Sequence, residues 1–316
     1  MAGRANGRPC VTVFAPSPLL TITIEPAGAD PELHLHAGGQ GVWVARMAAA
    51  LGARVELCAA LGGETGRVLR ALLDDERFRL RAVASSVTNG AYLHDRRDGQ
   101  RREIAETPSR RLPRHDADEL YGTTVTTGLE SDITLLTGPW PPTVLDADAY
   151  RRLARDLRCN RRRAIADLSG EALRGALAGG VELVKLSVDE VVAGGWASDG
   201  STRAVLEALE RLRAAGARST ILTRGPDPAF ALVDGRLHEL TGPRFEALEP
   251  RGSGDAMFAA LGVALAAGQS VLEALRLGVA AGALNATRRG LGTGHRAEVE
   301  RLAPHVRVRE LGGSGT

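Results

Sequence analysis

A loop with the composition of a phosphoryl-transfer site occurs late in the chain, at "RGSGD" (251–255), directly before a run of small apolar residues. Gly252 and Gly254 allow a tight turn and a close approach of the backbone to a ligand. The first amides of a helix have no intrahelical partner, and together with the helix dipole they attract anions. We expect the amides of Gly252, Ser253 and Gly254 to hold developing negative charge, while Asp255 accepts the proton of an attacking hydroxyl. The motif alone leaves open a second interpretation, in which Asp255 is only a helix cap.

The segments around this loop follow the pattern of an α/β protein. Repeated strand–helix units imply a mostly parallel central sheet with helices on both faces. In such a sheet, ligands bind beyond the carboxyl ends of the strands, and the loop before a helix lies at that edge. The expected strands are 11–16, 132–138, 162–168, 181–186 and 218–225, and the expected helices are 38–52, 146–158, 169–178, 201–215, 253–268 and 270–287.

Two regions do not fit this parallel sheet. The segments "LLTITIE" (19–25) and "ELHLHA" (32–37) alternate apolar and polar residues with period two, as half-exposed strands do. The segment 79–107 is typical of antiparallel strands joined at Asp98-Gly99, a favoured turn pair. We expect these strands to form a small β-sheet lid, contributed by about residues 18–37 and 79–107, on a single α/β domain spanning residues 1–316.

The composition excludes several classes of function. The chain has 316 residues and a formal net charge of only +2, with both signs interspersed, which argues against a main role on nucleic acid or at a membrane surface. The three cysteines, Cys10, Cys58 and Cys159, are too widely spaced for a disulfide framework or a metal-binding pair. The segment "MAGRANGRPC" (1–10) has no apolar core, so we expect no secretory signal, and no apolar run reaches membrane-spanning length. We expect a cytoplasmic protein that acts on a small molecule.

Three stretches carry a family likeness. They are "HAGGQGVWVARMAAALGARVELCAALGGETGRVLRALL" (36–73), "ADLSGEALRGALAGGVELVKLSVDE" (166–190) and "PRGSGDAMFAALGVALAAGQSVLEALRLGVAAGALNATRRGLGTG" (250–294). With them the chain resembles the ribokinase-like carbohydrate kinases, specifically the phosphofructokinase-B group, which includes the fructose-1-phosphate and tagatose-6-phosphate kinases. The likeness covers nearly the whole chain in order. It implies a ribokinase-like fold in which a β-lid covers the substrate.

The resemblance also implies roles for single residues. Asp255 would be the catalytic base, the loop Gly252–Gly254 the anion hole, and ATP and Mg2+ the partners of the reaction. The nucleotide side would be formed by residues near the phosphates and their magnesium, by a loop touching ATP and by a helix beside the adenine, namely Lys185, Ser187, Glu190, Thr223, Gly225 and Asn285, with Glu190 meeting the metal through water.

Lys185 is the one lysine among 40 basic residues. A compact ammonium is a point charge suited to a phosphate, and this distinguishes it from the planar guanidinium of arginine. The alternative is a solvent-exposed lysine at a strand end.

The sugar side departs from the family more than the nucleotide side. Gly38 and Gly39 would let a sugar sit against the backbone, but the usual Asn-Pro-Ala-Leu-Asp is replaced by a segment with Ser17 and Thr21. In the Gly-Gly-Lys-Gly-x-Asn signature, Gln40 replaces the lysine and Trp43 replaces the asparagine. Trp43 is either a flat wall for a ring or a core residue of its helix. Ser187 stands for an asparagine in the segment linked to magnesium, and Val87 stands for an arginine that is expected to meet a substrate phosphate.

Charged residues of the lid allow two interpretations. Arg96, Arg97, Arg101 and Arg102 either reach a phosphorylated substrate or form a solvated face. His34 and His36 share one face of a strand, but no third ligand accompanies them, so we expect no metal there. An exposed lid edge can pair with another copy, which predicts a homodimer.

Three functions remain after these arguments. The first is an ATP- and magnesium-dependent kinase that phosphorylates a hydroxyl of a sugar or sugar phosphate. The second is a non-catalytic module with the same fold that binds a nucleotide or metabolite. The third is a kinase of a non-sugar or nucleoside-like alcohol, which Trp43 would suit. Asp255 favours an enzyme, because a sensor does not need a base.

Overall fold

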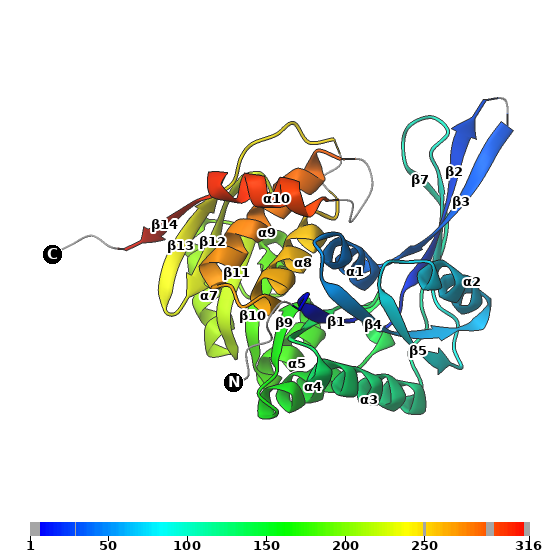
Figure 1. Ribbon diagram of the computed structural model, residues 1–316, viewed down its shortest axis with the longest axis horizontal. Helices are drawn as coiled ribbons and strands as arrows, with labels where there is room; N and C mark the ends of the chain where they lie inside the picture. The colour runs from blue at the N-terminus through cyan, green and yellow to red at the C-terminus, as the bar shows by residue number, and fades with distance from the viewer. Residues whose placement is uncertain (1–6, 29, 249–250, 289–293, 313–316) are drawn as a thin grey trace.

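The computed structural model describes residues 7–28, 30–248, 251–288 and 294–312 (Figure 1). The helices are α1 Gln40–Ala50, α2 Gly63–Asp74, α3 Arg114–Glu130, α4 Ala147–Cys159, α5 Gly170–Gly179, α6 Val188–Ala193, α7 Thr202–Ala214, α8 Ser253–Ala266, α9 Val271–Ala286 and α10 Arg296–Leu302. Within these described ranges, no helix is both long enough and apolar enough to cross a lipid bilayer.

A large sheet runs through the molecule. The order of its strands is β14-β13-β12-β11-β10-β9-β8-β1-β4-β5. Neighbouring strands pair in parallel from β11 through β10, β9, β8, β1 and β4 to β5. Strands β12, β13 and β14 continue the sheet beyond β11 in antiparallel pairing. The expectation of a mostly parallel sheet is confirmed. The strands are β1 Cys10–Phe14, β4 Arg54–Gly62, β5 Arg79–Ser85, β8 Ile133–Thr137, β9 Arg163–Asp167, β10 Val181–Ser187, β11 Ala217–Arg224, β12 Asp227–Val233, β13 Arg236–Thr241 and β14 Arg307–Leu311.

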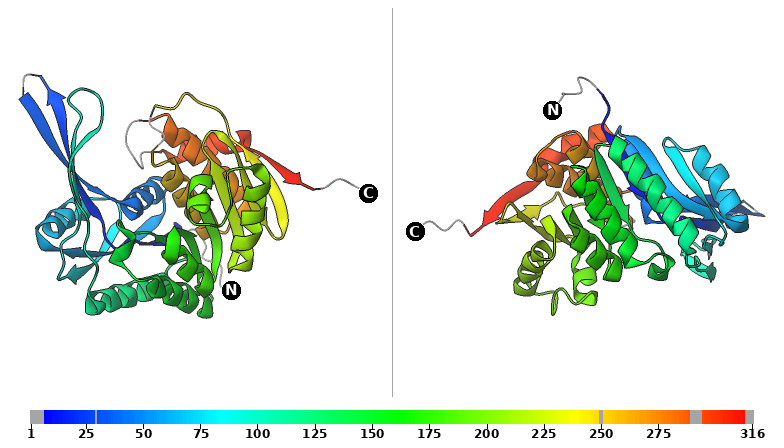
Figure 2. Two further views of the ribbon diagram at one scale, coloured as in Figure 1. Left: turned by 180° about the vertical axis from the view of Figure 1, so that it is seen from behind. Right: turned by 90° about the horizontal axis from the view of Figure 1, so that it is seen from below.

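Helices cover both faces of this sheet, as Figures 1 and 2 show. One buried cluster joins the sheet to α1, α8, α9 and α10, and a second joins it to α3, α4, α5 and α7. In β8, Ile133 and Leu135 belong to the first cluster and Leu136 to the second. This is why the parallel strands are continuously apolar: successive side chains enter opposite cores.

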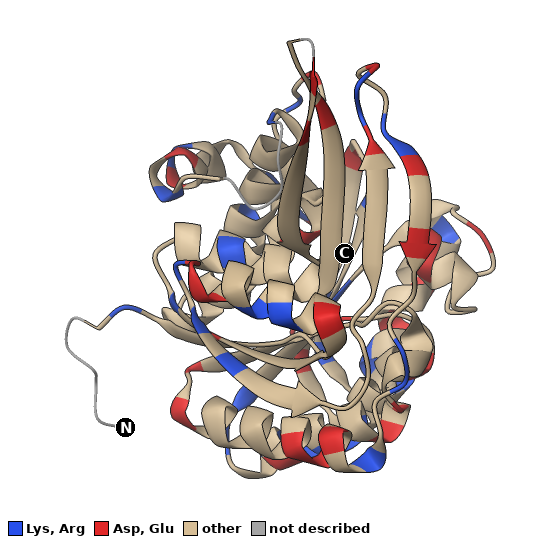
Figure 3. Ribbon diagram, turned by 90° about the vertical axis from the view of Figure 1, so that its right-hand side faces the viewer, with Lys and Arg blue, Asp and Glu red and all other residues tan. Residues whose placement is uncertain are grey.

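The lid is a separate sheet with the strand order β3-β2-β6-β7. It rises away from the main sheet in Figure 1. Its strands are β2 Leu19–Ala27, β3 Asp30–Gly38, β6 Ala91–Asp95 and β7 Arg102–Thr107. Figure 3 shows that the charged residues of β2 and β3 are confined to the tip of the lid.

The expected lid range 79–107 is wrong in its first part. Residues Arg79–Ser85 form β5, which pairs in parallel with β4 and is an edge strand of the main sheet. Leu80 and Ala82 pack on one core of that sheet and Val83 is buried in the other. Because apolar residues of β5 meet both cores, the strand is stable only inside the layered domain. Only the β6–β7 hairpin of this range belongs to the lid.

Candidate active site

The "RGSGD" loop leads directly into α8. Gly252 precedes the helix with φ 77°, in the left-handed region that favours glycine. No side chain caps the first N–H groups of α8, so the interpretation of Asp255 as a cap finds no support in the hydrogen bonds of the helix. Asp255 is the third residue of α8 and is half-buried. The uncapped amides and the carboxylate therefore lie at one helix end, as the sequence predicts.

Helix α9 packs against this loop and holds it in place. Asn285, expected beside adenine, is 1% exposed and donates from its Nδ2 to the carbonyl oxygen of Arg251 at 3.0 Å. A side chain at Gly282 would meet the carbonyl oxygen of Ser253 at 3.1 Å, so the backbones of α9 and the loop lie close together. In the described structure the buried hydroxyl of Ser253 has no hydrogen-bond partner. Asn285 thus positions the loop.

A buried ion pair lies beneath the loop. Lys185 of β10 is 5% exposed, and its Nζ donates to Oδ2 of Asp167, the last residue of β9, at 2.8 Å. A Cβ on Gly254 would come within 2.7 Å of the same Nζ, so the loop presses against the ammonium. Lys185 is therefore not a solvent-exposed lysine. Its charge lies at the amino end of α8, between the loop and a carboxylate.

The charges of this cluster act on one another. Burial and the neighbouring carboxylate of Asp167 raise the pKa of Asp255 to about 7, against the opposing effect of Lys185. Burial also raises the pKa of Asp167, to about 6, although Lys185 pairs with it. Burial alone would lower the pKa of Lys185, but the carboxylates of Asp167 and Glu190 outweigh it and raise that pKa. Lys185 stays charged, and Asp255 changes its charge near neutral pH, where a general base is most effective.

Glu190 is held at the start of α6. Its Oε2 accepts the backbone N–H of Ser187 at 2.7 Å and the Ser187 hydroxyl at 2.8 Å, and the Ser187 Oγ accepts the Glu190 N–H in return. This reciprocal capping fixes Glu190 beside the ion pair. Among the described residues, no group of three or more His, Cys, Asp or Glu side chains is arranged to hold a metal ion.

Two residues expected near ATP follow on the neighbouring strand. Thr223 pairs in register with Ser187, and its hydroxyl donates to the carbonyl oxygen of Leu186 at 3.4 Å. Gly225 has φ +60°, and no atom lies near the position that a side chain would take. The register of β10 and β11 thus places Thr223 beside the capping turn of Glu190, and Gly225 follows two residues later in the chain.

A cavity of about 190 Å³ opens next to the ion pair. Gly39 and Gln40, two residues predicted for the sugar side, line it, and the Gln40 Oε1 accepts the N–H of Gly138 at 2.9 Å. The Gln40 side chain also acts weakly against the rise in the pKa of both Asp167 and Asp255. The other lining residues are Ser17, Leu19, Gly138, Pro139, Trp140, Asp167, Leu168, Ser169 and Glu190.

Other residues expected at the sugar are not part of the cavity lining. Thr21 and Trp43 do not line the cavity. A side chain on Gly38, the last residue of β3, would meet the Thr21 hydroxyl at 2.9 Å and the Trp43 ring at 3.4 Å, so the lack of a side chain there makes room for both. The guanidinium of Arg46 covers the Trp43 ring at 4.7 Å from its centre. This contact occupies one face of the ring.

Comparison with known proteins decides the family. The profile described as pfkB family carbohydrate kinase matches residues 19–297. The chain belongs to the pfkB carbohydrate kinase family. It is therefore a kinase whose acceptor group is a hydroxyl.

Its relatives match over most of their length. The chain is 29% identical to an ATP-dependent 6-phosphofructokinase isozyme 2 of Mycobacterium tuberculosis, covering 94% of this chain and 90% of the relative. It is also 29% identical to the isozyme of Escherichia coli K12 that carries the same name, covering 80% of this chain and 82% of the relative.

Solved structures show the same fold. A point mutant of phosphofructokinase-2 from Escherichia coli superposes with a TM-score of 0.82 at 25% identity, covering 93% of this chain and 98% of that chain. A carbohydrate kinase from Agrobacterium tumefaciens superposes with a TM-score of 0.73 at 20% identity, covering 96% of this chain and 100% of that one.

Two residues at the centre of this pfkB site were not singled out from the sequence. Asp167 stands in the "DLSG" motif directly after an expected strand, and that position was a usable signal. Trp140 gave no such signal. It lines the cavity, is 47% exposed, and donates from Nε1 to Oε1 of Glu106 on the lid strand β7 at 2.6 Å. This bond joins the lid to the rim of the main sheet.

Proposed function

We propose that this pfkB kinase transfers the γ-phosphoryl group of ATP to a hydroxyl of a small carbohydrate, with Asp255 as the base. The observation that carries the proposal is the position of Asp255, in the first turn of an uncapped helix and near a buried ammonium, with a pKa raised by burial to about 7. A carboxylate in that environment accepts a proton from an alcohol as the alcohol attacks phosphorus.

The other groups stabilise the charge of the transferred phosphoryl. The amides of Gly252, Ser253 and Gly254 and the Nζ of Lys185 converge on the amino end of α8. Fixed donors of this kind favour the transition state because they need no reorganisation as charge develops. The Ser253 hydroxyl, buried and without a partner in the described structure, is a further donor available to a phosphate oxygen.

The nucleotide side consists of the ends of β10 and β11. Glu190, fixed by Ser187 while lining the cavity, is the residue that would hold Mg2+, through water and beside the phosphates. When bound, the ion neutralises phosphate charge. Thr223 and Gly225 would contact ATP, and the two relatives named above are called ATP-dependent. We place the protein in the cytoplasm, where ATP is supplied.

The cavity favours an acceptor without a phosphate. None of the described residues that line it is Lys or Arg, whereas Asp167 and Glu190 are carboxylates. Without a cationic side chain in this lining, a dianionic substrate group would lose its hydration there without gaining a partner.

The arginines of the lid are engaged elsewhere. Arg97 and Arg102 pair with Asp95, and Arg101 contacts His94 at 2.7 Å. A neutral sugar is thus the acceptor that the cavity fits best. The relatives' names keep a sugar phosphate as the second candidate.

Paired substrates test this proposal. ATP consumption is measured with fructose against fructose 6-phosphate, tagatose against tagatose 6-phosphate, and adenosine as a nucleoside. We expect a neutral sugar to give the highest kcat/KM. Turnover of phosphorylated sugars alone would leave the kinase in place and refute the neutral acceptor. ATP binding without turnover of any acceptor would refute catalysis and indicate a binding module.

We also propose a homodimer formed through the lid. Leu33 and Leu35 of β3 are 64% and 42% exposed, and the register places them on one face with Ile22 and Ile24 of β2. A contiguous apolar face of this kind usually marks an interface. The E. coli phosphofructokinase-2 has been solved in a tetrameric inhibited form. Light scattering should give twice the chain mass, and Leu33→Asp should give the monomer mass.

A further inference from the structure

A second concave site lies at the opposite edge of the main sheet. It is a hollow of about 920 Å³ formed before β1, at the start of β4 and around the start of β5. These are the amino ends of parallel strands, whereas the catalytic cluster lies at their carboxyl ends. The charged side chains that line the hollow are Arg8, Arg54, Arg77, Arg79, Glu56 and Glu76.

The charge of this hollow is positive. Arg8, Arg77 and Arg79 are exposed, and within the described ranges none of them forms an ion pair. The two carboxylates are already neutralised from outside the hollow. Glu56 pairs with Arg81 at 2.7 Å and Glu76 pairs with Arg46.

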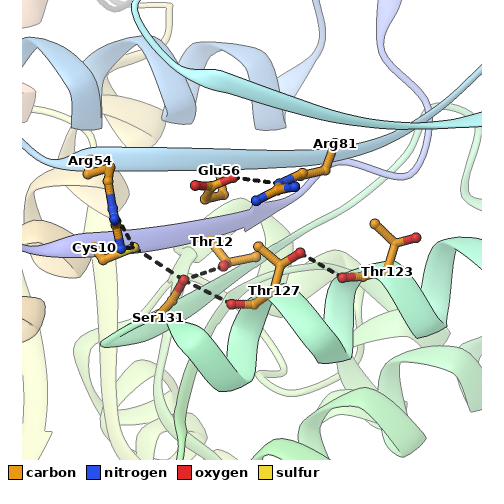
Figure 4. Close-up of polar contacts among 8 residues, drawn as sticks. All are labelled: Cys10, Thr12, Arg54, Glu56, Arg81, Thr123, Thr127 and Ser131. Atoms are coloured by element: carbon orange, nitrogen blue, oxygen red, sulfur yellow. Dashed lines mark hydrogen bonds and ion pairs between the residues drawn. The ribbon is translucent and has the colours of Figure 1, made fainter.

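Arg54 is the one guanidinium of the hollow that the protein holds in place. Its Nε and Nη2 donate to Sγ of Cys10 at 3.3 and 3.1 Å (Figure 4). Cys10 Sγ also lies 3.4 Å from the Ser131 Oγ, where either group can donate, and the Ser131 hydroxyl in turn contacts the Thr12 hydroxyl and the carbonyl oxygen of Thr127. Since Cys10 is 1% exposed, this relay is buried, and it holds one edge of the guanidinium while three of its five N–H groups are left for a ligand.

We propose that this hollow binds a metabolite carrying two or more phosphoryl groups, at a site separate from the catalytic one. Four guanidinium groups from three chain segments surround it, and a guanidinium forms bidentate bonds that match phosphate oxygens. The volume suits a ligand of nucleotide size. Inorganic phosphate offers one charged group and uses only part of the site.

Calorimetry of the full chain with inorganic pyrophosphate, without Mg2+ and at about 150 mM NaCl, tests the proposal. Wild type should bind, and Arg77→Ala/Arg79→Ala should weaken that binding at least about tenfold, since bonds to charged groups contribute strongly. The matched control is Arg155→Ala/Arg203→Ala, which removes two exposed arginines that lie in α4 and α7 and lack ion pairs in the described structure. It should bind within about twofold of wild type.

Two outcomes would overturn the proposal. One is wild-type protein that does not bind pyrophosphate. The other is equal binding by wild type and by Arg77→Ala/Arg79→Ala, which would assign the ligand to the phosphate site at α8.

A second pair of variants tests the relay. Cys10→Ala removes the acceptor of Arg54 and should weaken binding about threefold, whereas Cys10→Ser keeps an acceptor and should restore it. Equal binding by Cys10→Ala and wild type would refute the positioning role.

Discussion

The phosphoryl side and the acceptor side of this site are built in different ways. Around Asp255, the parts are buried, charged and in close contact: an ammonium against a glycine, a carboxylate on that ammonium, and a helix end. Around the acceptor cavity, the wall apart from Asp167 and Glu190 consists of uncharged residues, and one of them, Trp140, is 47% exposed. The difference teaches that phosphoryl transfer requires fixed charges, whereas the choice of acceptor depends on a few side chains of the cavity wall that can be substituted.

Removal of the base should have the largest effect. Asp255→Asn keeps the size of the side chain but cannot accept the proton, so kcat should fall by about 10²–10⁴-fold. ATP binding and thermal stability should change little, because no hydrogen bond of the α8 start depends on this side chain. Steady-state kinetics and calorimetric titration with ATP measure both. Near-normal turnover of the Asn variant would remove Asp255 from the mechanism.

The addition of a single methyl group to the loop should have the second-largest effect on activity. Gly254→Ala places a Cβ 2.7 Å from Lys185 Nζ, so either the ammonium or the loop must move. Displacement by about 1 Å can cost about 10²-fold in rate, and we expect a loss of that order in kcat. Gly122→Ala in α3 is the control, since no atom lies within 4 Å of its Cβ position. If both variants keep wild-type rates, the contact has no catalytic role.

The pH profile should show the titration of Asp255. The base works only when it is deprotonated, and its pKa is raised to about 7, so kcat/KM should rise about tenfold per pH unit below 7 and level off above it. A profile that is flat between pH 5 and 8, for an acceptor with no titration of its own in that range, would contradict the assignment. Fluorescence thermal melts over the same range separate loss of activity from unfolding.

Breaking the buried ion pair tests the phosphoryl side through the free energy of unfolding. Lys185→Ala leaves Asp167 buried without its partner and should lower the free energy of unfolding by about 3–5 kcal/mol. The KM for ATP should rise more than that for the acceptor. Lys185→Ala/Asp167→Ala should recover part of the stability without recovering activity. A double variant no more stable than Lys185→Ala would show that the unpaired carboxylate is not the cause.

The smallest effect is expected on the acceptor side. Trp140→Phe keeps an aromatic wall but removes the donor to Glu106, so the lid closes less firmly. A hydrogen bond contributes about 1 kcal/mol, which predicts a KM for the acceptor about fivefold higher with little change in kcat. Trp196→Phe is the matched control, because its Nε1 has no partner in the described structure. Equal KM values in both variants would separate Trp140 from lid closure.

The same contrast explains what the sequence can predict. The parallel sheet and the helix after "RGSGD" follow from local patterns, namely apolar runs and glycines beside a helix start. The ion pair joins Asp167 and Lys185, 18 residues apart on neighbouring strands, and no local pattern states which carboxylate meets the ammonium. The position of Trp43 likewise depends on Arg46 and Gly38, whose contacts form only after folding.

Two elements show where local patterns mislead. Strand β5, "RLRAVAS", alternates like a lid strand. It is nevertheless an edge strand of the main sheet, because both of its faces meet buried cores. Helix α3 contains "GTTVTTG", whose β-branched and glycine residues disfavour a helix, and no helix was expected there. Packing of Leu120 in the core stabilises it, and the hydroxyls of Thr124 and Thr127 donate to carbonyls one turn earlier. Tertiary contacts decide which sheet β5 joins, and in α3 they override helix propensity.

The single ε-amino group of this protein has a practical consequence. Because Lys185 is the only lysine and is 5% exposed, an amine-selective acylating reagent applied to the folded chain meets no exposed ε-amino group. Modification of this side chain requires the ammonium to leave Asp167 and reach solvent. The labelling rate at this one position, read by intact mass, therefore reports how often the catalytic centre opens.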